Sequence, residues 1–403
     1  MRKELLLIGC LIGLTANADF INDGYLLLNH ETFDKKDIWN SELVADKLDD
    51  EQSNLNLGFN GNIEQMEYQL KLKSDEDDTV EIKKLFYIYD FADNLSLKLG
   101  KFIENWQLAY SLPTLDVTDP YYQPSINDPM DQNQGINAIA LQYYGDDKTV
   151  TFYSNNDDED YDPMRGYGYS ANAIRVNQVL NDDSDLTFIL HQKHGANIGT
   201  GVGIRNIVND NLKLYSSFFS RRGTTLATHK AIVDNNPNYI ATSTPIDEHL
   251  KQENKQYHRL MLGLQYTTDN NLEIIIEALD DKRRMDDQQW NTYRQMVNNH
   301  ENLPEQIRNP NLAWDLSLVN PNGLRQRYYF IYFNKKLDSQ NLIYHRRIST
   351  DASALNTFQW QWNILDDLLL SASFSLTSGA DDSEYRSYFP EQDKLTMLMR
   401  YNF

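Results

Sequence analysis

The chain ends with Lys394-Leu-Thr-Met-Leu-Met-Arg-Tyr-Asn-Phe403. Every second residue counted back from the end is apolar, namely Phe403, Tyr401, Met399, Met397 and Leu395, and the residues between them are polar apart from Leu398. Alternation with a period of two is typical of a β-strand with one apolar face. Such a strand would invite aggregation at a free sheet edge, whereas a closed barrel in lipid has no free edge. The stretch therefore predicts a membrane β-barrel.

This segment resembles the C-terminal strand of Gram-negative outer-membrane β-barrels. In that class the terminal Phe is part of the signal read by the barrel-assembly machinery. The resemblance implies that Phe403 and Tyr401 form an assembly signal and that the protein lies in the outer membrane. It also implies that its partners include the assembly machinery, outer-membrane lipid and lipopolysaccharide.

The start of the chain predicts export. A short basic segment, Met1-Arg2-Lys3, precedes an apolar run over residues 5–14, and Ala16-Asn17-Ala18 fits the cleavage site of a secretory signal peptide. We expect a signal peptide over residues 1–18 and a single barrel domain over residues 19–403. A lipoprotein signal at Cys10 is the alternative, but few residues precede that cysteine. Cys10 is the only cysteine, so cleavage would exclude disulfides, Cys-based metal sites and thiol catalysis.

Alternating segments recur along the whole chain. They predict about 18 strands, with 16 to 20 as the range, and single-chain bacterial barrels require an even number. The expected strands lie near 24–32, 53–60, 62–73, 80–91, 95–103, 136–145, 148–155, 167–179, 185–194, 200–208, 211–220, 257–268, 271–279, 325–337, 340–349, 354–365, 368–377 and 394–403. No later run is long and apolar enough for a transmembrane helix.

The connections between these strands alternate in length. Turn residues form every second connection: Asn60-Gly61, Asp93-Asn94, Asp146-Asp147, Asn181-Asp182-Asp183, Asn209-Asp210-Asn211, Asp269-Asn270, Asp338-Ser339 and Asp366-Asp367. The longest loops, at 33–52, 104–135, 156–166, 221–256, 280–324 and 378–393, all fall on the other side. This pattern predicts an all-β fold, a closed, up-and-down, antiparallel transmembrane barrel with tight periplasmic turns. Residues 286–296 could form a short helix within one long loop.

The face opposite the apolar one must line the lumen. It carries basic side chains that we predict to line the pore and to contact solutes: Lys71, Lys98, Lys193, Arg205, Lys213, Arg221, Arg259, Lys394 and Arg400. Fewer acidic residues share these faces, namely Glu67, Asp90, Glu273 and Glu277. The facing of Arg175, Arg325, Arg327, Arg346 and Arg347 stays open. Either the basic residues select anions, or they solvate the interior and pair with acidic residues across strands. The net charge of −22 does not decide this, because the acidic excess sits in loops.

One internal segment resembles porin-like outer-membrane families, including alginate-export-like barrels. It comprises Leu97-Lys-Leu-Gly-Lys101, Trp106, Pro113, Asp116-Val117 and Asp119-Pro120, although Asn105-Trp106-Gln107 replaces the usual Trp-Gly pair. The resemblance implies a channel with a basic lumen, and alginate-like solutes would be acidic polysaccharides. Loop 104–135, stiffened by several prolines, could fold inward and narrow the pore, as could loop 280–324.

Other functional classes have weaker support. The sequence has no His-Glu-x-x-His, Gly-x-Ser-x-Gly, Walker or dinucleotide motif, so we expect no enzyme, although His191 and His194 lie near a strand end. Acidic loop clusters lack EF-hand spacing, and we expect no metal and no cofactor. We predict an outer-membrane channel for passive diffusion of small hydrophilic, anionic solutes, monomeric or homotrimeric, without a nucleic-acid partner. The alternatives are acidic-polysaccharide export or uptake, a surface adhesin or receptor, and a large secreted all-β protein.

Overall fold

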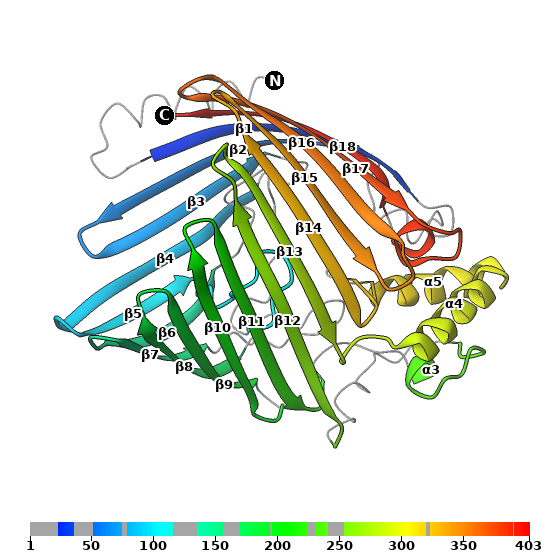
Figure 1. Ribbon diagram of the computed structural model, residues 1–403. Helices are drawn as coiled ribbons and strands as arrows, with labels where there is room; N and C mark the ends of the chain where they lie inside the picture. The colour runs from blue at the N-terminus through cyan, green and yellow to red at the C-terminus, as the bar shows by residue number, and fades with distance from the viewer. Residues whose placement is uncertain are drawn as a thin grey trace.

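The computed structural model describes residues 23–35, 51–74, 79–115, 135–155, 170–193, 196–224, 230–240, 254–319, 323–389 and 391–403. Their strands form one 18-stranded antiparallel sheet, in which each strand pairs with its neighbours in sequence and β1 pairs with β18 to close the barrel (Figure 1). This confirms the predicted fold class and strand number. The predicted signal peptide, residues 1–18, lies outside the described residues.

All the predicted strands are present, with ends shifted by a few residues. They are β1 (Asp23–Lys35), β2 (Glu51–Ile63), β3 (Met66–Ser74), β4 (Thr79–Ala92), β5 (Leu95–Phe102), β6 (Ile136–Tyr144), β7 (Lys148–Asn155), β8 (Ala171–Asn181), β9 (Ser184–Lys193), β10 (Gly199–Asn209), β11 (Leu212–Arg222), β12 (Gln256–Thr267), β13 (Leu272–Asp281), β14 (Arg327–Lys336), β15 (Gln340–Ser349), β16 (Ala354–Leu365), β17 (Leu368–Ser378) and β18 (Glu391–Asn402).

One predicted turn is wrong. β2 does not end at Asn60-Gly61, because Gly61 pairs with Tyr68 and Ile63 pairs with Met66. The chain reverses at Glu64 and Gln65, where Glu64 adopts a left-handed φ of 55°. The other tight connections lie at or next to the residues expected for them. Bacterial barrels have short periplasmic turns and long external loops, so we call the long-loop end of the barrel its outer end.

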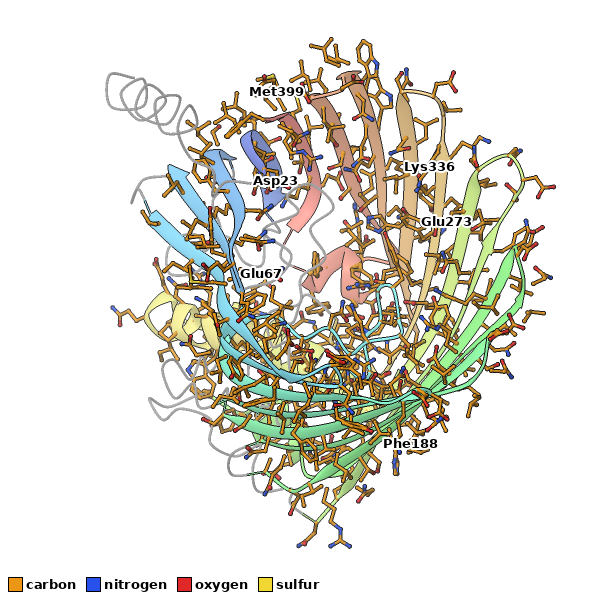
Figure 2. All side chains as sticks on the ribbon, turned by 90° about the vertical axis from the view of Figure 1, so that its left-hand side faces the viewer. Asp23, Glu67, Phe188, Glu273, Lys336 and Met399 are labelled. Carbon is orange, nitrogen blue, oxygen red and sulfur yellow. The ribbon has the colours of Figure 1, made fainter. Side chains whose placement is uncertain are left out.

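The two faces of the wall differ in chemistry. Phe188 and Met399 point away from the barrel, whereas Asp23, Glu67 and Glu273 surround its interior when it is viewed from the short-turn end (Figure 2). Large apolar side chains such as Leu262, Phe358 and Met397 are exposed on the outward face. A lipid-facing surface requires this arrangement.

Helices gather at the outer end of the barrel (Figure 1). They are α3 (Lys230–Val233), α4 (Asp287–Glu301) and α5 (Glu305–Ser317), which share one buried cluster and which we call the cap. The helix expected near residues 286–296 is thereby confirmed. It begins at a capping box in which Asp286 and Gln289 each accept the other's backbone N–H. No helix in the described residues is long and apolar enough to cross a membrane.

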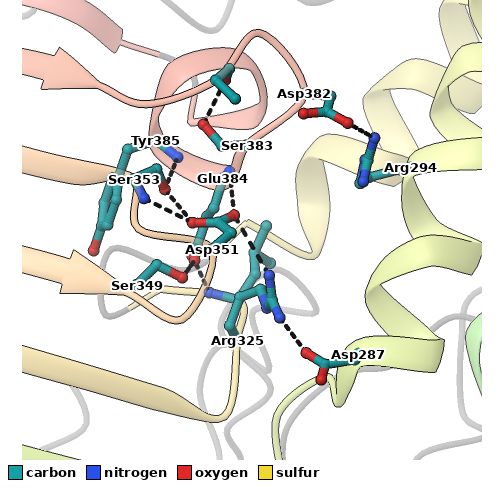
Figure 3. A network of polar contacts seen from close by, with 12 residues as sticks. Asp287, Arg294, Arg325, Ser349, Asp351, Ser353, Asp382, Ser383, Glu384 and Tyr385 are labelled. Carbon is teal, nitrogen blue, oxygen red and sulfur yellow. Dashed lines mark hydrogen bonds and ion pairs between the residues drawn. The ribbon is translucent and has the colours of Figure 1, made fainter.

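A polar network joins the cap to the barrel (Figure 3). Arg325, which precedes β14, forms ion pairs with Asp287 of α4 and with Asp351 of the β15–β16 turn. Nearby, the buried Glu384 of the short π-helical turn η3 (Glu384–Tyr388) accepts hydrogen bonds from the backbone N–H of Leu324 and the hydroxyl of Tyr328. Burial raises the pKa of Glu384, an effect that these hydrogen bonds oppose. The network joins α4, the residues before β14, the β15–β16 turn and η3 at the outer end of the barrel.

Candidate channel lumen

The segment after β5 folds into the barrel. Trp106 and Leu115 pack among Phe102, Tyr153 and Phe219, and Leu112 packs in a second buried cluster on the walls of β11 to β15. We call residues 103–115 the inner loop. The inward folding predicted for loop 104–135 is confirmed for this part, while residues 116–134 lie outside the described residues. The described part of the other loop expected to narrow the pore, 280–324, contributes α4 and α5 to the cap.

A single carboxylate holds the inner loop in place. Glu277 on the lumenal face of β13 is fully buried and accepts the backbone N–H groups of Tyr110, Ser111 and Leu112 at 2.5, 2.9 and 3.0 Å. The hydroxyl of Tyr215 donates to the same carboxylate at 2.9 Å. These donors compensate the cost of burying a charge, because hydrogen bonds to an ionised acceptor are the strong ones.

Further contacts fix the rest of the inner loop. Arg259 donates to the carbonyl oxygen of Pro113, Thr114 bonds to Ser217, and Arg347 donates to the Ser111 hydroxyl at 3.0 Å. β10 has glycine on its lumenal face where the inner loop passes, and this leaves room for the loop. A Cβ at Gly203 would lie only 2.6 Å from Leu108. The inner loop thus fills part of the lumen and narrows the passage.

Register and burial place all the predicted lumenal cations on the inward face of their strands. Three of them meet near the outer end, where Lys193 lies within electrostatic range of Arg221 and Arg259. His191, Asp281 and Arg283 complete this group, which we call the outer lumenal cluster. Its only carboxylate, Asp281, is shared by Arg259, Arg283 and Arg284.

The remaining predicted cations occur in smaller groups. Arg205 pairs with Asp185 at 2.6 Å, and Lys213 lies near them over the ring of Tyr215. Lys98 bonds to Glu104 of the inner loop and lies over the rings of Phe86 and Phe102. Lys394 pairs with Glu31 at 2.7 Å, whereas Lys71 is buried opposite Glu81.

Some of these cations form no ion pair with the acidic residues that the structure describes. Among the described residues, no carboxylate lies within ion-pair distance of Lys213, Arg221 or Arg400. Arg221 instead contacts His191 and the ring of Phe219. Neither neighbour can supply a negative charge. Positive charge on the wall is therefore only partly compensated by the acidic side chains described.

Several lumenal groups were missed at the sequence level. The alternation did not predict Asp281, Arg283 and Arg284 as lumenal, because they lie at the end of a strand and just beyond it. The basic run Lys282-Arg283-Arg284 is the signal in the sequence that marks this position. The register now places Arg175 and Arg347 on the inward face, opposite Ile189 and Phe330. Arg327 and Arg346 face outward, and Arg325 lies beneath the cap. Glu277 was expected on a lumenal face and Trp106 belongs to the porin-like segment, but no local pattern reveals that both hold the inner loop.

The C-terminal residues lie on the outward face at the short-turn end. Phe403 exchanges two backbone hydrogen bonds with Gly24, each of 2.9 Å, and packs edge-on against Phe59. Tyr401 lies beside it on the same face. Their role as an assembly signal stays a prediction.

The histidine sites considered for catalysis offer little chemistry. His191 is buried against Arg221, while His194 lies outside the described residues. Within the described ranges, no group of His, Cys, Asp and Glu side chains is arranged to hold a metal ion.

Neither a family model nor a curated protein sequence matches the chain. Solved structures do match its fold. Pseudomonas aeruginosa OccK11 (OpdR) has a TM-score of 0.57 at 9% identity, with 95% of this chain and 97% of that chain covered. P. aeruginosa OccK5 (OpdH) has a TM-score of 0.54 at 11% identity, with 96% and 99% covered. These structures are non-enzymatic outer-membrane porins.

At this identity the likeness shows the fold, a closed antiparallel β-barrel of the outer-membrane type. Identity this low bears on architecture and leaves the solute open. The chain has the fold of the OprD and OccK outer-membrane porins, a closed 18-stranded antiparallel barrel.

Proposed function

We propose that this barrel passes small anionic solutes by passive diffusion, and that its lumenal cations select them. The observation that carries the proposal is the outer lumenal cluster, where Arg259, Arg283 and Arg284 share the single carboxylate of Asp281. Arg221 adds a further guanidinium group near Arg283, and the Lys193 side chain lies beside it. Rings of cationic side chains favour anions in pores, and narrow walls of low dielectric constant strengthen their field.

The inner loop favours a small solute over a polymer. It occupies the lumen along β9 to β15 and is fixed there by Glu277, so an acidic polysaccharide would meet a built obstruction. One solved structure with this fold, P. aeruginosa OpdK, was determined with vanillate, an aromatic carboxylate. That ligand belongs to the other protein, and it is consistent with an anionic solute here. We further propose that residues 1–18 direct export.

The reversal potential in a planar bilayer under a KCl gradient tests the proposal. We expect an anion-selective current from the wild-type protein. Replacing Arg221 and Lys213 by Gln should lower the anion-to-cation permeability ratio by about twofold or more, because two basic side chains that form no ion pair with a described carboxylate leave the lumen. Substitutions at these positions change the charge of the lumen with fewer side effects than substitutions of Arg205 or Arg259 would. Arg205 forms an ion pair with Asp185, and Arg259 donates a hydrogen bond to the inner loop.

A matched control removes two cations from the outward face at the short-turn end, Lys148 and Lys335. That double Gln variant should keep the wild-type selectivity, since the lumen is unchanged. A cation-selective wild-type current, or an equal shift in both variants, would overturn the proposal. A barrel that does not conduct would point instead to a receptor or an adhesin.

A further inference from the structure

Outward-facing basic side chains gather on one sector of the outer rim. Arg222 ends β11, His258 lies near the start of β12, Lys282 follows β13 and Arg327 begins β14. The four strands are consecutive in the wall, and all four side chains are on the outward face. We call these four residues the basic rim.

The basic rim is contiguous in the register. Phe218, Leu260, Asp280 and Arg327 occupy one row of paired residues across β11 to β14. His258 pairs with Ser220, and the backbone N–H of Lys282 donates to the carbonyl of His258. The cationic groups therefore lie on neighbouring strands and face the same surroundings.

Among the residues that the structure describes, one acidic side chain forms ion pairs in this sector. Asp280 forms ion pairs with Lys282 at 2.9 Å and with Arg327 at 3.5 Å. The Arg327 side chain remains 58% exposed. In the described part of the chain, no carboxylate lies within ion-pair distance of Arg222. The described side chains of the sector are thus more basic than acidic, on a chain whose net charge is −22.

An aromatic belt marks the depth of the rim. Phe218 stacks on His258 with ring centroids 5.5 Å apart, and Tyr329 is half exposed two residues beyond Arg327 on the same face. Outward aromatic residues of membrane barrels lie at the level of the lipid headgroups. The basic rim therefore meets headgroups rather than acyl chains.

We propose that the basic rim binds the phosphate groups of lipid A, so that lipopolysaccharide is anchored to the β11–β14 sector. Lipid A is the headgroup that faces this rim in the outer leaflet, and it presents phosphates. Arginine binds phosphate through paired N–H donors, and a lysine or arginine near an anionic lipid surface strengthens binding severalfold. The proposal is independent of solute selectivity in the lumen.

Lipopolysaccharide binding to the refolded, detergent-solubilised barrel tests the idea. We expect Arg222→Gln with Arg327→Gln to weaken binding about tenfold or more. The Lys148→Gln, Lys335→Gln variant, which removes two outward cations from the opposite end, should bind within about twofold of the wild-type protein. The heat-dependent gel shift of a folded barrel verifies that each variant is closed.

Two measurements on the wild-type protein need no variant. Enzymatic removal of the lipid A phosphates should weaken binding as strongly as the rim substitutions do, and millimolar inorganic phosphate should compete poorly. Chelation of divalent cations should leave binding in place. Loss of binding on chelation would mean that acidic loops bind through bridging cations, and it would overturn the proposal. Unchanged binding by the rim variant or by dephosphorylated lipid would also overturn it.

Discussion

Glu277 and Tyr110 lie 167 residues apart in sequence, yet the carboxylate of one accepts the backbone N–H of the other at 2.5 Å. The acceptor sits on a rigid strand of the wall, and the donor sits on the inner loop. The bond therefore sets how far the loop reaches into the lumen. The width of the channel depends on a long-range contact rather than on the loop alone.

Replacing Glu277 by Ala should release the inner loop. Three backbone N–H groups would lose their charged acceptor, and each such bond contributes about 1.5–3 kcal/mol. We expect a loss of at least about 3 kcal/mol in the free energy of unfolding in liposomes. Single-channel recordings should show larger open-channel noise and stepwise closures as the loop moves.

Glu277→Gln and Tyr215→Phe calibrate this result. The Gln side chain keeps one oxygen acceptor, and Phe removes only the hydroxyl that donates to Glu277. Both variants should therefore show smaller effects than Glu277→Ala. If the open-channel noise of Glu277→Ala equals that of the wild-type protein, contacts other than Glu277 hold the inner loop and the prediction is wrong.

The sequence was sufficient for the barrel because alternation is a local property. Each strand carries its own apolar face, as Leu368, Leu370 and Phe374 do, and tight turns punctuate the pattern. The error at Asn60-Gly61 arose because a favourable turn dipeptide competes with pairing. Gly61 is paired with Tyr68, and the extra pairs down to Ile63 and Met66 outweigh the local preference.

The site was less predictable because its geometry depends on pairing across strands. The alternation placed Arg205 and Arg259 toward the lumen, but only the register sets Arg205 opposite Asp185 and Arg259 opposite Asp281. These partners decide which charges remain for a solute. Arg347 and Arg346 are adjacent on a strand with aromatic residues on both faces, so their facing required the pairing of β14 with β15.

The cap should depend on Arg325 far more than on Arg294. Arg325 is nearly buried and pairs with the mostly buried Asp351 as well as with the exposed Asp287, whereas Arg294 pairs with the largely exposed Asp382. Breaking a buried ion pair costs about 3–5 kcal/mol, and an exposed one about 0–1 kcal/mol. Hydrogen exchange should show faster opening of α4 and α5 in Arg325→Ala and little change in Arg294→Ala. Equal effects would mean that the network does not hold the cap.

The stability of the cap should fall as pH rises. Burial would lower the pKa of His300, but its hydrogen bond to Asp315, at 2.7 Å, and the charge of that carboxylate outweigh burial and raise the pKa. The carbonyl of Tyr239 accepts from the other ring nitrogen at 2.6 Å. A raised pKa stabilises the folded cap fully below the unfolded value of about 6.5, and this contribution disappears as pH passes the folded value.

Hydrogen exchange of α4, corrected for intrinsic rates, measures this dependence between pH 6 and pH 9. The wild-type cap should open more readily at the higher pH. His300→Gln should flatten the profile, since no group at that position then titrates. A cap that is more stable at pH 9, or an unchanged profile in His300→Gln, would contradict the assignment.

Gly24 has no side chain, and the Phe403 ring occupies the space where a Cβ would lie, at the closure of β1 on β18. The two residues exchange backbone hydrogen bonds, and a Cβ at position 24 would lie 2.5 Å from the Phe403 ring. Gly24→Ala should therefore destabilise the folded barrel by about 1–3 kcal/mol through overpacking. Urea unfolding in liposomes measures this change. Gly145→Ala is the matched control, because its Cβ would meet nothing nearer than 3.3 Å.

A second substitution separates the clash from other effects of the methyl group. In a Phe403→Ala background the ring is absent, so Gly24→Ala should cost much less than it does in the wild-type protein. That coupling would show that the ring and the glycine form one fitted contact at the closure of β1 on β18. Additive effects of the two substitutions would show that Gly24 is needed for another reason, such as its approach to the Gly58 carbonyl at 3.2 Å from the added Cβ.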